Sequence, residues 1–578
     1  MKSIKKLLPY ATPYKLFVIL APLLMALEVA MDLLQPLLLQ KIIDYGIAEN
    51  DTTYVIQMGT FMIVAAIIGL IGGIGCTIFS TKSAINIATD IRRDLFNKIE
   101  HLSSENRDRI GTGKLITHVT SDINSVQQAI MMTLRIFVRG PLLFIGSVMI
   151  VFFQARELFP ILVILIPILL FFIILLSRKA GIWFKRVQEA LDQVNSKLQE
   201  SIAGIRVVKA FVRKEYEINL FHKVNVSLTN KTKIAEQIIT ILMPVLLFVI
   251  NIGMAVALLF GVFPIGGSTI QVGVILAFIN YLNIILMALT SSSMVLMQLM
   301  RALPSAVRIQ EVLEINTDRA ENSFDEMPIK GDVEFRNVSF SYSKKGENVL
   351  KSISFSASHG EKIGIIGATG SGKTTLVKLF PRLYDVAHGE ILIDGQNSKN
   401  ISLKQLRGSI GYVTQKPFLF SGSIKSNLIY GKKDASETEM QLASKNACAE
   451  EFIEKLDARY EHPLTQEATN LSGGQKQRLS LARAFVRKPS ILILDDATSA
   501  VDARSEAIIL NALKSSYPLT TIFMVSSKIS SLLDADKILV MDEGSIVGVG
   551  THDELLEACT VYQEIYQTQV QTGGVMVE

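Results

Sequence analysis

Six long apolar runs occupy the first half of the chain and restrict its fold more than any other feature. They lie near residues 16–38, 54–80, 128–153, 158–177, 238–262 and 272–300 of the 578-residue sequence. A helix needs about 20 apolar residues to cross about 30 Å of hydrocarbon, so the runs predict six membrane-spanning helices. The first run continues to Leu39 without a small-residue cleavage site, which favours a retained span over a removed signal peptide.

The composition agrees with a membrane protein. Hydrophobic residues make up 49% of the chain and charged residues only 19%, against about 25% charged in typical soluble domains. This balance excludes intrinsic disorder and a collagen-like chain. Cys76, Cys448 and Cys559 have neither disulfide-framework nor metal-ligand spacing, and we interpret them as reduced thiols. The net charge of +5 comes from basic residues beside the apolar runs, which indicates membrane topology and no nucleic-acid partner.

Basic residues are divided unevenly between the connections, and this sets the expected orientation. The connections 81–127 and 178–235 carry many lysines and arginines, whereas 39–53 and 154–157 carry one each and 263–271 carries none. Because basic connections stay inside, both termini are expected in the cytoplasm. The two basic connections are rich in helix formers, so we expect the spans to continue as helices beyond the bilayer.

The ends of the membrane half are less regular in sequence. Residues 1–14 predict either a short amphipathic helix on the inner leaflet or a disordered basic tail. The polar residues of 301–330 indicate a linker. We therefore expect a transmembrane domain over 1–300, a linker over 301–330 and a soluble domain over 331–578.

The soluble half alternates short apolar strands with helical segments. Strands are expected at 362–366, 491–494, 521–525 and 537–541. This alternation is typical of an α/β domain around a mainly parallel sheet. The fold class expected from the whole sequence is a membrane all-α domain of six helices followed by an α/β domain.

A phosphate-binding loop lies between the first of these strands and a helix expected at 375–383. Residues 367–374, Gly-Ala-Thr-Gly-Ser-Gly-Lys-Thr, match G-x-x-x-x-G-K-[ST]. The glycines let backbone N–H groups surround phosphates, Lys373 reaches the β- and γ-oxygens, and Thr374 can bind Mg²⁺. The loop therefore predicts ATP and Mg²⁺ binding by Gly367, Gly370, Ser371, Gly372, Lys373, Thr374 and Thr375.

Asp495 follows the strand at 491–494. It fits the Walker B carboxylate that holds the metal. Alone this pattern is weak, because buried strands often end in an acid.

Residues 471–475, Leu-Ser-Gly-Gly-Gln, lie between the two motifs and precede a helical run over 476–487. With Gln415 after a strand at 411–414, this order resembles the ATP-binding cassette (ABC) family. Six spans and one cassette resemble a half-transporter of the exporter type, including bacterial multidrug exporters in the cell membrane. The resemblance covers essentially the whole chain.

The resemblance implies a head-to-tail dimer in which each ATP lies between one chain's Walker A loop and the other chain's signature. Ser472, Gly473, Gly474 and Gln475 are then the signature residues that meet the partner's nucleotide. A helix start suits this role, because its N–H groups and dipole attract a γ-phosphate. A glycine-rich helix cap without a ligand is the alternative.

Three further roles are implied by the same resemblance. Tyr342 matches the aromatic residue that stacks on adenine, Gln415 matches the residue that contacts Mg²⁺ and the attacking water, and Asp502 matches the loop that communicates across the dimer. The metal ligands are then Thr374, Gln415 and Asp495. A plainer alternative stays open for each: packing for Tyr342, an exposed loop polar for Gln415 and a helix-start cap for Asp502.

Two positions depart from the family pattern, and both serve hydrolysis. The family has glutamate directly after the Walker B aspartate and histidine near the γ-phosphate; here these positions hold Asp496 and Ser527. General-base catalysis depends on hydrogen-bond reach, so the shorter carboxylate should hold water badly, and serine carries no positive charge. Conservative drift is the alternative for either change alone.

We therefore expect Asp496, Gln415 and Ser527 to form a degenerate catalytic site that binds ATP and hydrolyses it slowly. The chain then resembles the degenerate-site subunit of a heterodimeric exporter, with a second half-transporter as partner. Residues 465–468, Thr-Gln-Glu-Ala, also depart from the Gly-Glu-Arg-Gly usual in homodimeric exporters. A homodimeric lipid or peptide exporter and a regulatory ATP-binding subunit are the alternatives.

Glu28 and Asp32 lie one helical turn apart in the first run, where carboxylates are costly unless they face a cavity or a partner. Arg135 and Arg139 are candidate partners. The third run starts in the cytoplasm, so we expect those arginines near its inner end, where they can snorkel away from the acids. The acids then predict either a cation-attracting cavity or a structural hydrogen bond.

Methionines are frequent in the runs. They suit either varied amphipathic drugs or lipids as cargo, or lipid-facing filler. They are Met25, Met31, Met58, Met62, Met131, Met132, Met243, Met254, Met287, Met294, Met297 and Met300.

Overall fold

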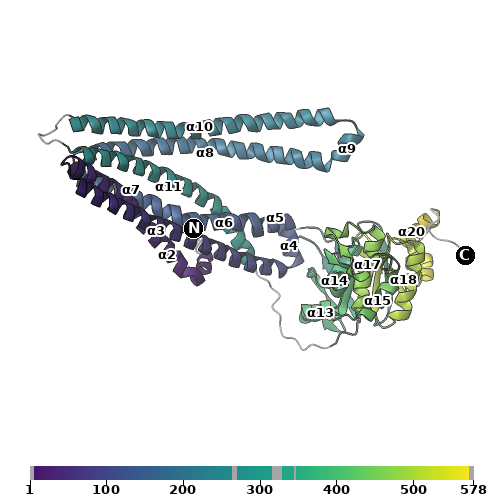
Figure 1. Cartoon of the computed structure of the whole chain (residues 1–578). Coiled ribbons are helices and arrows are strands. Elements are labelled where there is room, and N and C mark those ends of the chain that lie inside the picture. The colour runs from purple at the N-terminus through teal and green to yellow at the C-terminus, as the bar shows by residue number, and fades with distance from the viewer. Residues whose placement is uncertain (1–5, 263–269, 316–327, 344–345, 572–578) are drawn as a thin grey trace. The chain divides into compact units, whose positions relative to one another are not determined.

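The computed structural model describes residues 6–262, 270–315, 328–343 and 346–571, and the chain divides into two compact units (Figure 1). The first unit is Met1–Glu100 with Gly113–Ile315, and the second is His101–Thr112 with Asn316–Glu578. Each unit has its own apolar core. The short segment 101–112 belongs to the second unit, although in sequence it connects two long helical segments of the first.

The first unit is helical, and the six predicted spans are confirmed. Among the described residues, six helical segments are long and apolar enough to cross a membrane: Leu8–Ile47, Thr52–Glu100, Thr112–Gln154, Phe159–Ala203, Lys214–Phe260 and Val272–Ser292. The helices of this unit are η1 (Leu8–Tyr14), α2 (Lys15–Lys41), η2 (Ile42–Ile47), α3 (Thr52–Glu100), α5 (Thr112–Thr117), η3 (His118–Asp122), α6 (Ile123–Met132), η4 (Thr133–Phe137), α7 (Val138–Gln154), α8 (Phe159–Ala203), α10 (Lys214–Val262) and α11 (Val272–Leu313), with the short α9 (Ile205–Ala210) between the fourth and fifth spans.

Several of these helices are much longer than a membrane is thick. Helices α3 and α10 have 49 residues each, and α8 has 45. At 1.5 Å per residue, 49 residues extend about 74 Å, more than twice the hydrocarbon thickness. In Figure 1, α8 and α10 form a hairpin joined by α9, while α2, α3, α7 and α11 lie together.

The polar segment predicted as a linker begins later than expected. Helix α11 continues to Leu313, so residues 301–313 are helical. The buried side chains there, Ala302, Ala306, Ile309 and Val312, recur every three to four residues and define one helix face, which the polar residues between them obscure in the sequence. The rest of the expected linker, 316–327, lies outside the described residues. Residues 1–5 also lie outside the described residues. The rest of the N-terminal segment contains η1, which begins at Leu8.

The second unit is built on a six-stranded sheet in the order β12-β11-β3-β10-β9-β6. Its strands are β3 (Lys362–Gly367), β6 (Ile410–Val413), β9 (Ile491–Asp495), β10 (Thr521–Val525), β11 (Lys537–Asp542) and β12 (Ser545–Gly550). All neighbours pair in parallel except β11 and β12. The four predicted strands and the parallel sheet are confirmed. Strands β9 and β10 are buried along their whole length, as continuous apolar runs in a parallel sheet should be.

Two smaller sheets and a set of helices complete the unit. The antiparallel sheet β2-β1-β4-β5 consists of β1 (Val333–Phe340), β2 (Leu350–Ala357), β4 (His388–Ile393) and β5 (Gln396–Asn397), and β7 (Gly422–Ser423) pairs with β8 (Pro463–Leu464). The helices are α4 (Ser104–Ile110), α12 (Lys373–Leu379), η5 (Ser398–Asn400), α13 (Leu403–Ser409), α14 (Ile424–Ile429), α15 (Glu437–Asn446), α16 (Glu450–Ile453), η6 (Arg459–Glu461), η7 (Gln466–Ala468), α17 (Gly473–Val486), α18 (Ala503–Ser516), η8 (Ile529–Ser531), α19 (His552–Ala558) and α20 (Thr560–Gln571). The helix expected at 375–383 ends at Leu379. Phe380 still has helical angles, but Pro381 after it has no backbone N–H with which to continue the helical hydrogen bonds.

Candidate nucleotide-binding site

The carboxyl ends of four parallel strands converge on one cavity of the second unit. Strands β3, β10, β9 and β6 are successive neighbours, so the loops that follow them lie at the same edge of the sheet. These loops border a cavity of about 410 Å³. The predicted residues that line it are Gly370, Gly372, Lys373, Thr374, Thr375, Gln415, Asp495, Asp496 and Ser527.

The loop after β3 has a backbone that requires glycine. Gly372 has a φ of +98°, in the left-handed region, and a Cβ there would lie 2.8 Å from Leu350 Cδ2. A Cβ on Gly367 would lie 2.1 Å from the carbonyl oxygen of Met541. The glycines of the motif therefore allow a tight loop against β11.

Two polar side chains of this loop differ in their access to the cavity. Lys373 Nζ donates to the carbonyl oxygens of Gly367 and Ala368, each at 2.8 Å, which orients the amine within the loop. Burial lowers the pKa of the Lys373 ammonium. Ser371 Oγ is buried and has no hydrogen-bond partner among the described residues. Ser371 does not line the cavity, so of these two side chains only Lys373 borders the space for a phosphate.

The expected metal ligands also meet here. Thr374 Oγ1 donates to Asp495 Oδ1 at 3.0 Å, and Gln415 lines the same cavity. Burial raises the pKa of the Asp495 carboxyl, whose residue is only 2% exposed. A hydroxyl, a carboxylate and an amide oxygen are hard ligands of the kind that Mg²⁺ prefers, and Mg²⁺ bound with a nucleotide needs few protein ligands. The residues present therefore fit Mg²⁺.

The two departures from the family pattern occupy this same cavity. Gln415 Nε2 donates to Asp496 Oδ2 at 3.4 Å, and the Asp496 backbone N–H donates to the carbonyl oxygen of Val525 at 3.0 Å. Ser527 follows β10 and lines the cavity beside them. The short carboxylate and the uncharged side chain therefore belong to one site.

Tyr342 lies at the edge of the loop. Its Oη is 3.1 Å from Thr375 Oγ1, and its ring packs edge-on against Phe340 and Tyr384, with centroids 4.9 and 5.2 Å away. The packing alternative is thus present, yet Tyr342 remains 44% exposed, which leaves surface for a second ring. Tyr384 Oη donates to Asp108 Oδ2 in α4. Sequence reasoning missed Tyr384, because nothing local separates it from other aromatic residues.

The signature residues lie away from the cavity. Ser472 Oγ accepts from the Gln475 N–H and Gln475 Oε1 accepts from the Ser472 N–H, which forms a capping box at the start of α17. Ser472 and Gly473 are exposed, and none of residues 472–475 lines the cavity. A Cβ on Gly473 would meet no atom within 4 Å, whereas one on Gly474 would lie 2.8 Å from the Ala500 carbonyl oxygen. One chain alone does not bring its signature to its own phosphate loop.

Three hydrogen bonds of Gln477 tie the signature helix to Asp496 and to the loop that follows it. Gln477 Nε2 donates to the Asp496 carbonyl oxygen and to Ser499 Oγ, each at 3.2 Å, and Gln477 Oε1 accepts from the Ala500 N–H. Sequence reasoning missed this buried glutamine; its only signal is a polar residue on the inner face of α17. Asp502 caps α18 by accepting from the Ser505 N–H at 2.9 Å, which lowers the pKa of Asp502. The cap alternative for Asp502 is therefore present, and its role across a dimer stays a prediction.

In the first unit, the expectation that Arg139 lies away from the acids is wrong. Arg139 Nη1 lies 3.1 Å from Glu28 Oε1, and Nη2 lies 2.9 Å from Asp32 Oδ2. The third span begins at Thr112 and not near residue 128, so Arg139 stands about 40 Å along it. The acids therefore have a cationic partner.

Comparison with family models places both halves of the chain. Residues 18–289 match the ABC transporter transmembrane region, and residues 350–499 match the model described as ABC transporter.

Whole-chain relatives give the same result. The chain is 40% identical over 570 residues to an uncharacterized ABC transporter ATP-binding protein, YfiB, of Bacillus subtilis strain 168, with 99% of each chain covered. It is 32% identical to YknU of the same organism, covering 98% of each chain, and 32% identical to MT1311 of Mycobacterium tuberculosis, covering 97% of this chain and 98% of that one. A solved bacterial Atm1-family ABC exporter with ATP bound superimposes with a TM-score of 0.79 at 23% identity, covering 96% of this chain and 98% of that one. At this identity the likeness concerns the fold.

Proposed function

The chain belongs to the ABC transporter family, as a multi-pass exporter half with one ATP-binding domain, and we propose that it is the degenerate-site subunit of a heterodimeric exporter. It binds ATP at its own phosphate loop and hydrolyses it slowly, while its signature completes the hydrolytic site of a second half-transporter. The proposed cargo is an amphipathic drug or lipid. Both termini are proposed to lie in the cytoplasm at the cell membrane, with the chain up to the end of α11 at Leu313 as the transmembrane domain and its helical extensions, and 331–578 as the cassette.

The observation that carries this proposal is that Asp496 and Ser527 line one cavity with Lys373 and Thr374. The binding residues are those of an intact phosphate loop, and the two hydrolytic positions beside them hold short side chains. A well-placed general base contributes about 10²–10⁴-fold to rate, or about 3–5 kcal/mol of barrier. A site without one retains binding and loses most of its turnover.

Each side chain has a separate task in this proposal. Lys373 and the loop N–H groups hold the phosphates, the exposed face of Tyr342 stacks on adenine, and Thr374, Gln415 and Asp495 hold Mg²⁺. Bound Mg²⁺ neutralises charge on the phosphate oxygens. The exposed Ser472 and Gly473 are free to face the partner's nucleotide, so an intact signature keeps a use in a chain whose own hydrolytic positions are impaired.

The proposal is tested by restoring the missing side chains. The purified lone chain should hydrolyse ATP poorly, and co-expression with its partner half should raise turnover. The double variant Asp496→Glu with Ser527→His should raise the turnover of the lone chain by about tenfold or more. The longer glutamate carboxylate restores a general base within hydrogen-bond distance of the attacking water. Lys373→Ala in the double variant serves as control and should abolish the gain. High turnover by the unaltered lone chain would instead support a homodimeric exporter.

A further inference from the structure

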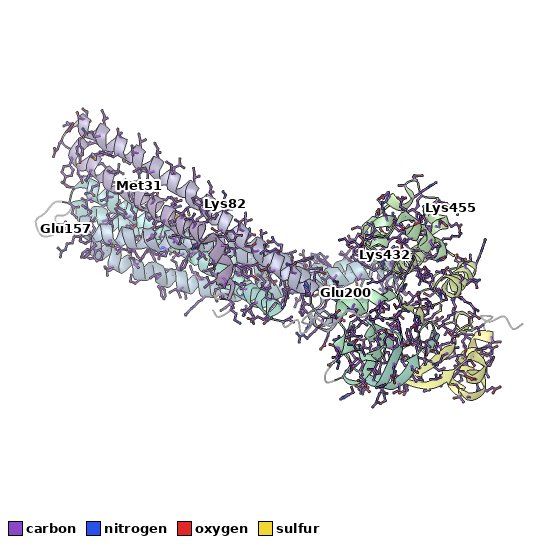
Figure 2. The ribbon with its side chains drawn as sticks, turned by 90° about the horizontal axis from the view of Figure 1, so that it is seen from below. Met31, Lys82, Glu157, Glu200, Lys432 and Lys455 are labelled. Carbon is purple, nitrogen blue, oxygen red and sulfur yellow. The ribbon has the colours of Figure 1, made fainter. Side chains whose placement is uncertain are left out.

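A charged cavity in the first unit is not used by the nucleotide chemistry. It has a volume of about 650 Å³ and lies between α2 and α3, with Arg135 of η4 at its border. Its charged lining residues are Glu28, Asp32 and Arg135, and Gln35 and Thr77 add polar groups. Met31, labelled in Figure 2, belongs to the α2 wall.

The charges of this cavity are separated and only partly matched. Glu28 and Asp32 share the single guanidinium of Arg139, so the pair of acids retains one negative charge. Arg135 is exposed and has no hydrogen bond or ion pair among the described residues. With Arg139 counted beside the acids, the four charges sum to zero. Arg135 nevertheless has no anionic partner, and one of the two carboxylate charges has no cation of its own. Unmatched charges in a membrane span are costly, which makes them strong points of ligand attachment.

The backbone around the charges keeps them in place. A Cβ on Gly73 would lie 2.8 Å from Glu28 Oε2, so the absence of a side chain at this position lets the carboxylate lie directly on α3. Arg135 stands in η4 (Thr133–Phe137), a π-helical turn between α6 and α7. Such turns redirect side chains and are frequent at functional sites. The position of Arg135 thus rests on a local feature independent of the acids.

Part of the cavity lining is apolar. Leu70, Ile74 and Ile78 line it from α3 and are 62%, 52% and 47% exposed. Charged side chains and apolar side chains therefore line the same cavity, and this combination suits an amphipathic molecule.

We propose that this cavity binds a zwitterionic amphipath. The anionic phosphate or carboxylate of the ligand pairs with Arg135, its ammonium group pairs with the Glu28 and Asp32 carboxylates, and its apolar chain lies along Leu70, Ile74 and Ile78. The inference rests on the proposed export function and names the substrate class within it. A cation alone leaves Arg135 unmatched, and an anion alone leaves the acids unmatched.

The test uses three photoreactive probes with the same apolar chain and different heads: phosphocholine, carboxylate and trimethylammonium. The full-length chain is placed in nanodiscs of phosphatidylglycerol, and the labelling of α2 and α3 is measured. The phosphocholine probe should label about fivefold or more above either single charge, a preference of about 1 kcal/mol. Equal labelling by the trimethylammonium probe would overturn the proposal.

Variants of the cavity test separately the recognition of the anionic group and of the cationic group of the probe. Arg135→Gln should make the phosphocholine and trimethylammonium probes equal, and Asp32→Asn should weaken the phosphocholine probe while sparing the carboxylate probe. Arg178→Gln, an exposed arginine of α8 outside the cavity, is the matched control and should change nothing. Ala66→Trp should block every probe by filling the cavity from its exposed side, with the neighbouring exposed Ile67→Trp as its control.

Two further measurements show whether the ligand comes from the membrane or from solution, and whether the chain still binds ATP. Adding phosphatidylethanolamine to the nanodisc should compete with the probe if the ligand is a membrane lipid, whereas competition only by a soluble zwitterionic amphipath assigns a ligand from solution. Photolabelling by an azido-ATP analogue is measured on the same samples. Retained ATP labelling with no head-group preference refutes the zwitterion site alone, while loss of ATP labelling in the unaltered chain refutes the proposed function.

Discussion

Gln415 Nε2 lies 3.4 Å from Asp496 Oδ2, so the two residues expected to hold the attacking water contact each other. Asp496 has a φ of +52° and is fixed by its N–H bond to Val525. A backbone held in this way cannot move forward to compensate for a shorter side chain. The carboxylate therefore stays near the amide, which supports a weak base at this position.

Asp496→Asn should lower the ATPase rate of the assembled pair by less than about tenfold. Asparagine keeps the shape of the side chain and removes only a base that is already badly placed. The measurement is steady-state ATPase of the co-purified pair. A fall of about 10²–10⁴-fold would show this site to be the hydrolytic one and reverse the assignment.

Gly473→Asp should remove most turnover of the pair, by about 10²-fold or more, because it places a carboxylate opposite the partner's γ-phosphate. This position is preferable to Gly474, where any Cβ collides with the Ala500 carbonyl oxygen. Gly408→Asp is the matched control, since Gly408 is also exposed and its Cβ would meet open space. Unchanged turnover in Gly473→Asp would mean that this signature faces no working nucleotide site.

Asp495→Asn should raise the midpoint of thermal unfolding at pH 7 without nucleotide, and abolish the rise that Mg²⁺ with ATP produces. Burial raises the pKa of Asp495, so the folded chain binds this proton more tightly than the unfolded chain does, and the ionised carboxylate destabilises the fold at neutral pH. The gain should shrink as the pH falls through the folded-state pKa and vanish below about 4, the ordinary value. A gain independent of pH would contradict this explanation.

Local sequence predicts the parts of this molecule whose signals are local. Each span needs about 20 apolar residues in a row, and the phosphate loop needs glycines at fixed offsets after a strand, so both are visible without tertiary structure. The helical residues 301–313 were hidden, because their buried face consists of small and aliphatic side chains spaced among charged ones.

Contacts between elements that are distant in sequence leave no local signal. The bridge from Arg139 to Glu28 and Asp32 depends on where the third span starts and how α7 lies against α2. Gln477 and Tyr384 act through contacts with loops far away in sequence, and neither stands in a motif of its own.

Arg139→Gln should destabilise the first unit, because it leaves two carboxylates without a cation. Removing one partner of a buried ion pair costs about 3–5 kcal/mol. The partial exposure of Arg139 and Asp32, 41% and 40%, places the expected loss below that range. The measurement is thermal unfolding in detergent. Adding Glu28→Gln and Asp32→Asn should recover most of the loss, and a failure to recover would mean that Arg139 stabilises the unit in some other way.

Tyr384→Phe should separate nucleotide binding from its coupling to the spans. Tyr384 packs on Tyr342 and donates to Asp108, and α4 lies between α3 and α5 in sequence. Phenylalanine keeps the ring contact and removes one solvent-exposed hydrogen bond, which is worth about 0.5–1.5 kcal/mol net. ATP affinity should therefore change by less than about twofold, while substrate stimulation of the pair's ATPase should fall by about three- to tenfold.

Asp108→Asn tests the same contact from its other end and should produce the same loss, with no further loss in the double variant, because both changes remove one interaction. Tyr342→Ala is the contrasting variant. It removes the exposed ring beside the phosphate loop and should weaken ATP binding itself, so that stimulation returns at higher ATP concentration. If Tyr384→Phe weakened ATP binding as much as Tyr342→Ala, the Tyr384–Asp108 contact would serve to hold Tyr342 for the nucleotide and would carry no signal to the spans.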